Sequence, residues 1–213
     1  MNAQTVPAPS AMRMGAFEEH LAGNCYFDRY FGTDAVKILP GEYYVTTRDI
    51  ALVTVLGSCV TACIRDDEKK IGGINHFMLA EAGSGAEVVS ASARYGAYAM
   101  EILINHLLKL GARRDHLTAK VFGGGRVMKS LTSSQVGDKN ASFVLRYLKT
   151  ERIPVLAQDL LDTYPRKVYF FPATGRTLVK KLIRVHNETI ARREQEYAES
   201  LNCRPVSGDV ELF

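Results

Sequence analysis

The sequence has no long apolar stretch and no large excess of charge of either sign. No apolar run approaches the ~20 residues that a membrane-spanning helix requires. Lys and Arg outnumber Asp and Glu by 27 to 23, and this net charge of +4 is too small to argue for nucleic-acid binding by itself. The chain has 213 residues, 46% of them hydrophobic, which is enough to bury a sizeable core. These properties favour a soluble globular protein without membrane insertion.

Cysteine is scarce as well. The four cysteines, Cys25, Cys59, Cys63 and Cys203, are too few for a disulfide scaffold in a chain of this length. Residues 1–15 contain no apolar core of the kind that a secretory signal carries. We therefore expect a cytoplasmic protein with reduced thiols, in which each cysteine is structural, metal-binding or catalytic.

One segment is locally basic. Residues 165–193 carry eight Lys and Arg against a single acid, Glu188. Such a run is usually a solvated face, and it can also attract an acidic protein surface and so raise the rate of encounter.

The pattern of residues predicts more strands than helices. Runs rich in β-branched and aromatic residues predict strands at 42–45, 50–55, 60–65, 71–79, 118–122, 153–157, 167–171 and 177–183. Apolar residues at helical spacing predict helices at 93–110 and 140–149, the second capped by Asn140, with a surface loop over 84–92 and a short helix within 17–31. Several strands are joined by short turns, so we predict an α+β fold, a mixed or antiparallel sheet with helices packed on it. A partly flexible N-terminal extension (1–39), one domain (40–187) and a C-terminal tail (188–213) that begins with a helix-forming segment complete the prediction.

Cys59 follows Gly57-Ser58, where the backbone can turn sharply and leave a thiol accessible. The strands before and after 66–70 form a hairpin, and a turn centred between Asp67 and Glu68 would place His76 directly opposite Cys59. A cysteine nucleophile needs such a base within hydrogen-bonding reach. The pair is therefore a candidate catalytic site.

The same residues have simpler interpretations. Cys59 can be a small buried apolar residue and His76 a core histidine, and spacing alone does not exclude this. A zinc site formed by Cys59, Cys63 and His76 is disfavoured, because two residues four apart on a strand lie ~13 Å apart, too far to share one metal. The glycine run 123–125, followed by Arg126, lacks the Lys-Ser/Thr pair of a P-loop, and we expect a turn where backbone segments approach closely.

Taken together, the motifs resemble the chemoreceptor glutamine deamidase family CheD. The resemblance spans about residues 41–182 and rests on seven segments in the same order: 56–60 (LGSCV), 72–79 (GGINHFML), 94–101 (RYGAYAME), 122–124 (FGG), 153–155 (IPV), 166–170 (RKVYF) and 174–175 (TG). It implies a layered α/β sandwich, consistent with the strand-rich pattern.

The resemblance also implies an activity. The family's nucleophile falls on Cys59, its histidine on His76, and its third catalytic residue, a threonine upstream of the cysteine, on Thr54. The backbone of Gly57 and Ser58 would support the oxyanion. The implied substrates are glutamine side chains of methyl-accepting chemotaxis receptors, converted to glutamate with release of ammonia. No cofactor or metal is implied, and a CheC-type phosphatase is a further expected partner.

Two other functions remain open at this stage. A non-catalytic adaptor could bind chemoreceptors or a phosphatase, although such an adaptor has no need for both Cys59 and His76. A cysteine hydrolase acting on a small amide would need a deep, enclosed pocket.

Overall fold

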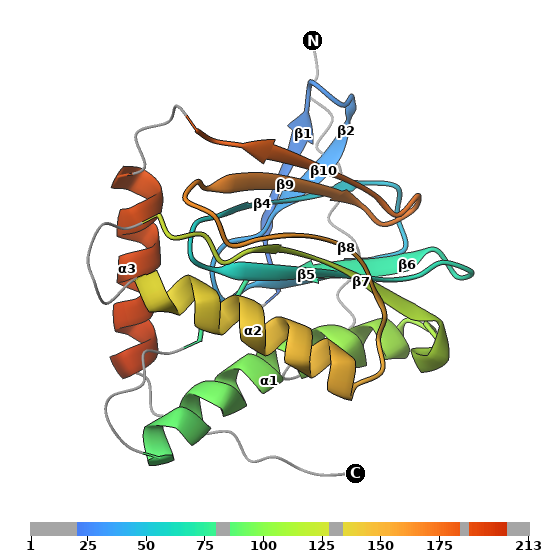
Figure 1. The fold of residues 1–213 in the computed structure, drawn as a ribbon. Helices are drawn as coiled ribbons and strands as arrows, with labels where there is room; N and C mark the ends of the chain where they lie inside the picture. Colours follow the sequence, from blue (N-terminus) through green and yellow to red (C-terminus); the bar gives the residue numbers. More distant parts are fainter. Residues whose placement is uncertain (1–20, 80–85, 128–133, 184–187, 204–213) are drawn as a thin grey trace.

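A computed structural model describes residues 21–79, 86–127, 134–183 and 188–203 (Figure 1). Within these ranges the chain forms ten strands, three α-helices and one short 3₁₀ turn, Arg114–His116. The α+β prediction is thus confirmed. None of the helices among the described residues is both long and apolar enough to span a membrane.

The first sheet has the strand order β1-β2-β4-β9-β10. Its strands are β1 (Asn24–Asp28), β2 (Thr33–Lys37), β4 (Ala51–Leu56), β9 (Arg166–Phe171) and β10 (Arg176–Lys181). Only the β2–β4 pair is parallel, so the sheet is mixed.

The second sheet has the order β3-β6-β5-β7-β8. Its strands are β3 (Tyr43–Thr46), β5 (Val60–Asp66), β6 (Ile71–Asn75), β7 (Leu117–Gly123) and β8 (Val155–Leu160). Here only β7 and β8 run parallel, so this sheet is mixed too.

The sheets and helices form three layers (Figure 1). One face of the second sheet packs against the first sheet, with Leu52, Ile74 and Phe170 in the core between them. Its other face is covered by α1 (Ala86–Lys109) and α2 (Ser134–Thr150), which bury Ile64, Leu103 and Val144 among others. The second sheet is thus covered on both faces, and every residue of its central strand β5 is buried.

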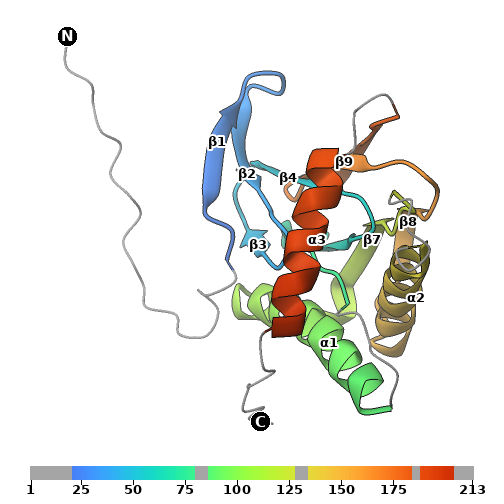
Figure 2. The ribbon, with the colours of Figure 1, turned by 90° about the vertical axis from the view of Figure 1, so that its left-hand side faces the viewer.

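The third helix, α3 (Glu188–Cys203), lies outside these layers. Figures 1 and 2 show it on one side of the molecule, running past the ends of both sheets toward α1. It is polar on most of its surface, and the residues turned toward the domain include Ile190, Glu194, Tyr197 and Ala198 at helical spacing.

All eight predicted strands are present, with ends that differ by a few residues. The prediction of a loop over 84–92 was wrong from Ala86 onward, because these small residues form the first turns of α1. The prediction of a helix within 17–31 was also wrong for the described part. There β1 pairs with β2, and the Asp28 carboxylate accepts hydrogen bonds from the N–H groups of Tyr30 and Phe31, which closes a turn instead of starting a helix.

Candidate active site

The site lies where strands of the two sheets end side by side. Thr54 belongs to β4 of the first sheet, whereas His76 follows β6 of the second. Thr54 Oγ1 and His76 Nδ1 are 2.7 Å apart. This hydrogen bond therefore joins the two sheets.

The partners of Thr54 determine the protonation of the imidazole. The single hydroxyl proton of Thr54 is donated to the carbonyl oxygen of Ile38 at 2.9 Å. Its oxygen must then accept the hydrogen bond from His76, so Nδ1 carries a proton and Nε2 is the basic nitrogen. Nε2 is buried and has no hydrogen-bond partner among the described residues.

The environment keeps His76 neutral. The residue is 2% exposed, and burial lowers the pKa of the imidazole to about 4, although the negative charge of Glu194 acts in the opposite direction. A neutral imidazole with a free Nε2 can accept a proton.

Cys59 lies in a short loop, residues 57–59, between β4 and β5. The loop is fixed through its carbonyl groups. The Gly57 carbonyl accepts a hydrogen bond from Gly125 N–H at 2.7 Å, and the Cys59 carbonyl accepts one from Gly124 N–H at 2.8 Å. The Ser58 carbonyl accepts one from the Asn140 side chain at 2.9 Å.

The glycine run packs directly against this loop. A Cβ at Gly123, where φ is +111°, would lie 2.2 Å from the Cys59 carbonyl oxygen. The expected close backbone approach at Gly123-Gly124-Gly125 is confirmed, but the expected turn is not, because Gly123 is the last residue of β7 and irregular chain follows it. Asn140 was predicted to cap a helix, and this was wrong, because α2 begins at Ser134. Asn140 instead donates a hydrogen bond to the 57–59 loop and accepts one from the N–H of Leu79.

With its carbonyls bound, the loop presents its N–H groups together to one carboxylate, that of Glu194 on α3. Oε1 accepts hydrogen bonds from the N–H of Gly57 at 2.8 Å and of Cys59 at 3.1 Å. Oε2 accepts hydrogen bonds from the Ser58 N–H at 2.8 Å and from its hydroxyl at 2.7 Å. Donors converging in this way form the type of site that stabilises an oxyanion.

The thiol of Cys59 is fully buried beside this carboxylate. Burial raises the pKa of Cys59 well above its ordinary value, and the charge of Glu194 raises the pKa further. With Glu194 in place, the thiol and the imidazole are therefore both neutral near neutral pH.

The hairpin places Cys59 and His76 on the same face, but not directly opposite each other. The pairs Cys63–Ile74 and Val60–Phe77 show that the turn is centred one residue later than predicted. Cys59 and His76 are thus diagonal neighbours just beyond the ends of β5 and β6. The face is preserved because the partner shifts by two residues, which is one full period of a strand.

The three side chains Cys59, His76 and Glu194 also have the donor types of a metal site. Their ligand atoms lie within 4.8 Å of one another, and all three residues are buried. However, each carboxylate oxygen of Glu194 already accepts two hydrogen bonds from the loop, which uses its lone pairs. A metal would have to displace these donors. Cys63, considered for zinc above, is buried in β5 and is not a member of this group.

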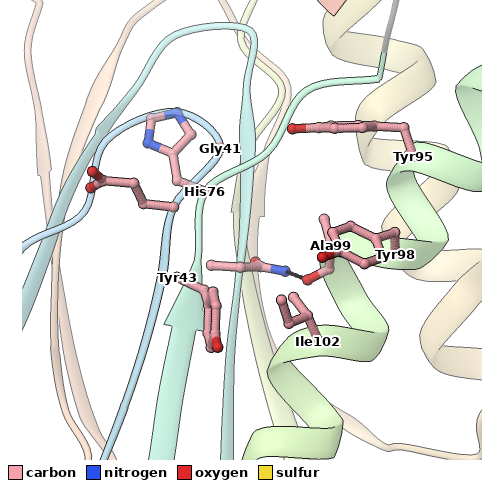
Figure 3. A pocket seen from close by; sticks show the side chains of 9 residues that line it. Gly41, Tyr43, His76, Tyr95, Tyr98, Ala99 and Ile102 are labelled. Atoms are coloured by element: carbon pink, nitrogen blue, oxygen red, sulfur yellow. Dashed lines mark hydrogen bonds between the residues drawn. The ribbon is translucent and has the colours of Figure 1, made fainter. Parts of the chain in front are cut away.

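Two hollows flank His76. Figure 3 shows one of them, with His76 and Gly41 on one side and Tyr95, Tyr98 and Ile102 of α1 on the other. The second lies between α3 and the segment that follows β2, and its lining residues are Lys37, Ile38, Leu39, Pro40, Val55, His76, Ile190, Arg193 and Glu194. His76 thus lines both hollows.

Glu194 was not among the residues predicted from the sequence to form the site. This residue lies 135 positions from Cys59 and in a segment that was predicted to be a tail. One signal was present in the sequence: Ile190, Tyr197 and Ala198 predict one face of a helix, and Glu194 is the acidic residue on that face.

The chain is similar to known proteins over most of its length. A family model described as "CheD chemotactic sensory transduction" matches residues 78–181. A probable chemoreceptor glutamine deamidase CheD 1 of Dechloromonas aromatica is 65% identical to this chain, and the match covers 93% of this chain and 98% of that protein. A probable chemoreceptor glutamine deamidase CheD of Methylobacillus flagellatus is 60% identical, and the match covers 92% of this chain and 98% of that protein. The one of Janthinobacterium sp. is 59% identical, and the match covers 92% of this chain and 97% of that protein.

Proposed function

Because this chain belongs to the CheD family, we propose that it is a chemoreceptor glutamine deamidase, a hydrolase that acts on side-chain amides. One observation supports the proposal above all. A buried thiol, a neutral imidazole with a free nitrogen and three convergent N–H groups meet at the end of the two sheets. These are the groups that acyl transfer from an amide requires.

In the proposed mechanism, Cys59 is the nucleophile. His76 Nε2 takes the thiol proton as the sulfur attacks the side-chain carbonyl carbon of a receptor glutamine. The N–H groups of Gly57, Ser58 and Cys59 hold the oxyanion, each such donor contributing about 3–4 kcal/mol in well-studied enzymes. Thr54 is a positioning residue that holds the imidazole through Nδ1.

The second half of the reaction regenerates the enzyme. His76 returns the proton to the nitrogen, the carbon–nitrogen bond breaks, and ammonia leaves behind a thioester on Cys59. A water molecule then gives a proton to His76 and attacks the thioester carbon, which releases glutamate and restores the thiol. The net change is amide plus water to carboxylate plus ammonium, and no cofactor takes part.

The proposal includes where the protein acts and what it binds. We place it in the cytoplasm, where its thiols stay reduced, with the cytoplasmic parts of methyl-accepting chemotaxis receptors as substrates. A CheC-type phosphatase is a second proposed partner, on the family resemblance. Co-purification of the two proteins tests that binding separately from catalysis.

The deciding experiment is incubation of the purified chain with receptor cytoplasmic fragments, followed by mass spectrometry of their glutamines. We expect conversion of glutamine to glutamate with the unmodified chain and none with Cys59→Ala. Stable binding without conversion by the unmodified chain would favour a non-catalytic adaptor. Conversion that persists in Cys59→Ala would exclude Cys59 as the nucleophile.

A further inference from the structure

Helix α3 closes the site through its own side chains. Glu194 binds the loop of residues 57–59, called the nucleophile loop from here on, and it is only 2% exposed. One turn further on, Tyr197 packs over Gly41, where an added Cβ would lie 2.9 Å from the ring, and its hydroxyl contacts that of Tyr95 on α1. By contrast, Arg192, Gln195 and Glu196 are exposed.

The contact between Glu194 and the loop also depends on Gly57. A Cβ there would lie 2.7 Å from Oε2 and 2.9 Å from Oε1 of Glu194. The absence of a side chain at position 57 therefore allows the Glu194 carboxylate to lie directly against the backbone of the loop. The loop N–H groups that the mechanism assigns to the oxyanion are all occupied by it.

The group that occupies these donors has the chemistry of the reaction product. Deamidation converts a glutamine side chain into a glutamate side chain, and Glu194 is a glutamate that reaches Cys59 from a helix. Its ligand atom lies within 4.8 Å of those of Cys59 and His76. Its carboxylate lies where the carboxylate of a newly formed product would be held.

We propose that α3 is an internal mimic of the product helix: the surface beneath α3 is the binding site for a helical substrate segment, and Glu194 holds the place of the glutamine to be deamidated. This inference rests on the proposed function. A receptor helix and α3 then compete for one surface, and the enzyme acts only after α3 has moved away.

The first test removes the carboxylate in the full chain. In Glu194→Ala the loop donors lose their partner, and we expect the rate of receptor deamidation to rise on the order of tenfold, since charge-assisted hydrogen bonds no longer hold α3 in place. Glu196→Ala removes the same charge from the exposed side of α3 and should behave like the unmodified chain.

A second readout does not require the receptor. Alkylation of Cys59 by iodoacetamide, followed peptide by peptide, should also be on the order of tenfold faster in Glu194→Ala than in Glu196→Ala. Cys25, which is exposed, serves as the reactive reference and Cys63, which is fully buried, as the unreactive one. Faster alkylation without any receptor deamidation would support the covering role of α3 while contradicting the proposed function.

The third test turns the mimic into a substrate. Glu194→Gln places a side-chain amide beside Cys59, and we expect the protein to hydrolyse it to the carboxylate with release of ammonia. The peptide 194–204 reports this by mass spectrometry, and Gln195, which is exposed and bound to Glu199, is an internal control that should stay an amide. The double variant with Cys59→Ala should retain both amides.

Each result has a defined meaning. Cys59-dependent conversion at position 194 alone supports the product mimic. If the amide at position 194 survives while Glu194→Ala still speeds alkylation, α3 is a cover but not a mimic, and the proposal is overturned. It is equally overturned if Glu194→Ala changes neither alkylation nor deamidation.

Discussion

At the level of single residues, the hydroxyl of Thr54 has two partners, and each constrains the other. Donation to Ile38 leaves the oxygen as an acceptor for His76 Nδ1. This arrangement selects the tautomer and holds the ring across the gap between the sheets. The imidazole is thus oriented by a neutral group, whereas many hydrolases orient their catalytic histidine with a carboxylate.

We therefore predict that Thr54→Val slows deamidation while Thr54→Ser largely preserves it. Loss of the hydrogen bond should cost about 1–2 kcal/mol in the transition state, or about 5–30-fold in kcat. The measurement is kcat with receptor fragments, with the unfolding free energy of each variant as a control. Equal rates for Thr54→Val and the unmodified chain would contradict the positioning role.

The buried imidazole also predicts how stability changes with pH. The pKa of His76 is about 4 in the folded protein and 6.5 for the unperturbed side chain, so between these values the unfolded chain binds more protons. The unfolding free energy should then fall as the pH drops from 6.5 to about 4, by up to about 1.4 kcal/mol per pH unit, and this contribution should be constant below that range.

Denaturant unfolding at several pH values checks this prediction. His76→Gln removes the titrating group, so its unfolding free energy should change less over the same range than that of the unmodified chain. A parallel decline in both proteins would assign the pH dependence to other groups.

At the level of elements, the end of β7 and the two glycines that follow it support the 57–59 loop. Gly123 (φ +111°) has no room for a side chain, whereas Gly111 (φ +99°) at the end of α1 faces open space. The two glycines have similar φ angles and differ in what surrounds them. Comparing an alanine substitution at each glycine therefore separates the effect of backbone strain from the effect of steric contact.

We predict that Gly123→Ala is the more destabilising of the two substitutions. Gly111→Ala should cost about 1–2 kcal/mol from its positive φ, and Gly123→Ala about 3 kcal/mol or more, because the Cys59 carbonyl must also move. Chemical denaturation measures both values. Similar losses would show that the loop tolerates displacement.

The sequence predicted the strands well because local patterns determine them, and parity along the hairpin placed Cys59 and His76 on one face despite the error in register. The strands β1 and β2 and the position of α3 escaped prediction for physical reasons. β1 exists because it pairs with β2, and a pairing partner is not visible in a segment of five residues. The place of α3 depends on a contact between residues 135 positions apart, which no local pattern specifies.

At the level of the whole molecule, two buried arginines join the sheets. Arg166 of β9 is fully buried and donates to Asp159 at the end of β8 and to the carbonyls of Gly123 and Leu161. Arg65 of β5 extends the other way, to the carbonyls of the turn at 172–173 after β9. Because Thr54 lies on one sheet and His76 follows a strand of the other, we expect these contacts also to maintain the hydrogen bond between them.

We predict that Arg166→Ala lowers the unfolding free energy by about 3–5 kcal/mol, since it removes a fully buried side chain, leaves a cavity and breaks the ion pair with Asp159. Arg176→Ala, at an exposed position of β10, should change the unfolding free energy by about 0.5 kcal/mol or less. Thermal or denaturant unfolding distinguishes the two. A small effect of Arg166→Ala would mean that packing alone aligns the sheets.

The covalent connection between β10 and α3 has a quantitative consequence. Residues 182–187 tether Glu194 to the domain, so the mimic is present at a fixed effective concentration, whatever the amount of protein. Every substrate competes with that same concentration, and the apparent affinity of each falls by the same factor. In this scheme α3 sets how much substrate the enzyme needs. The surface that the helix uncovers then determines which glutamines the enzyme prefers.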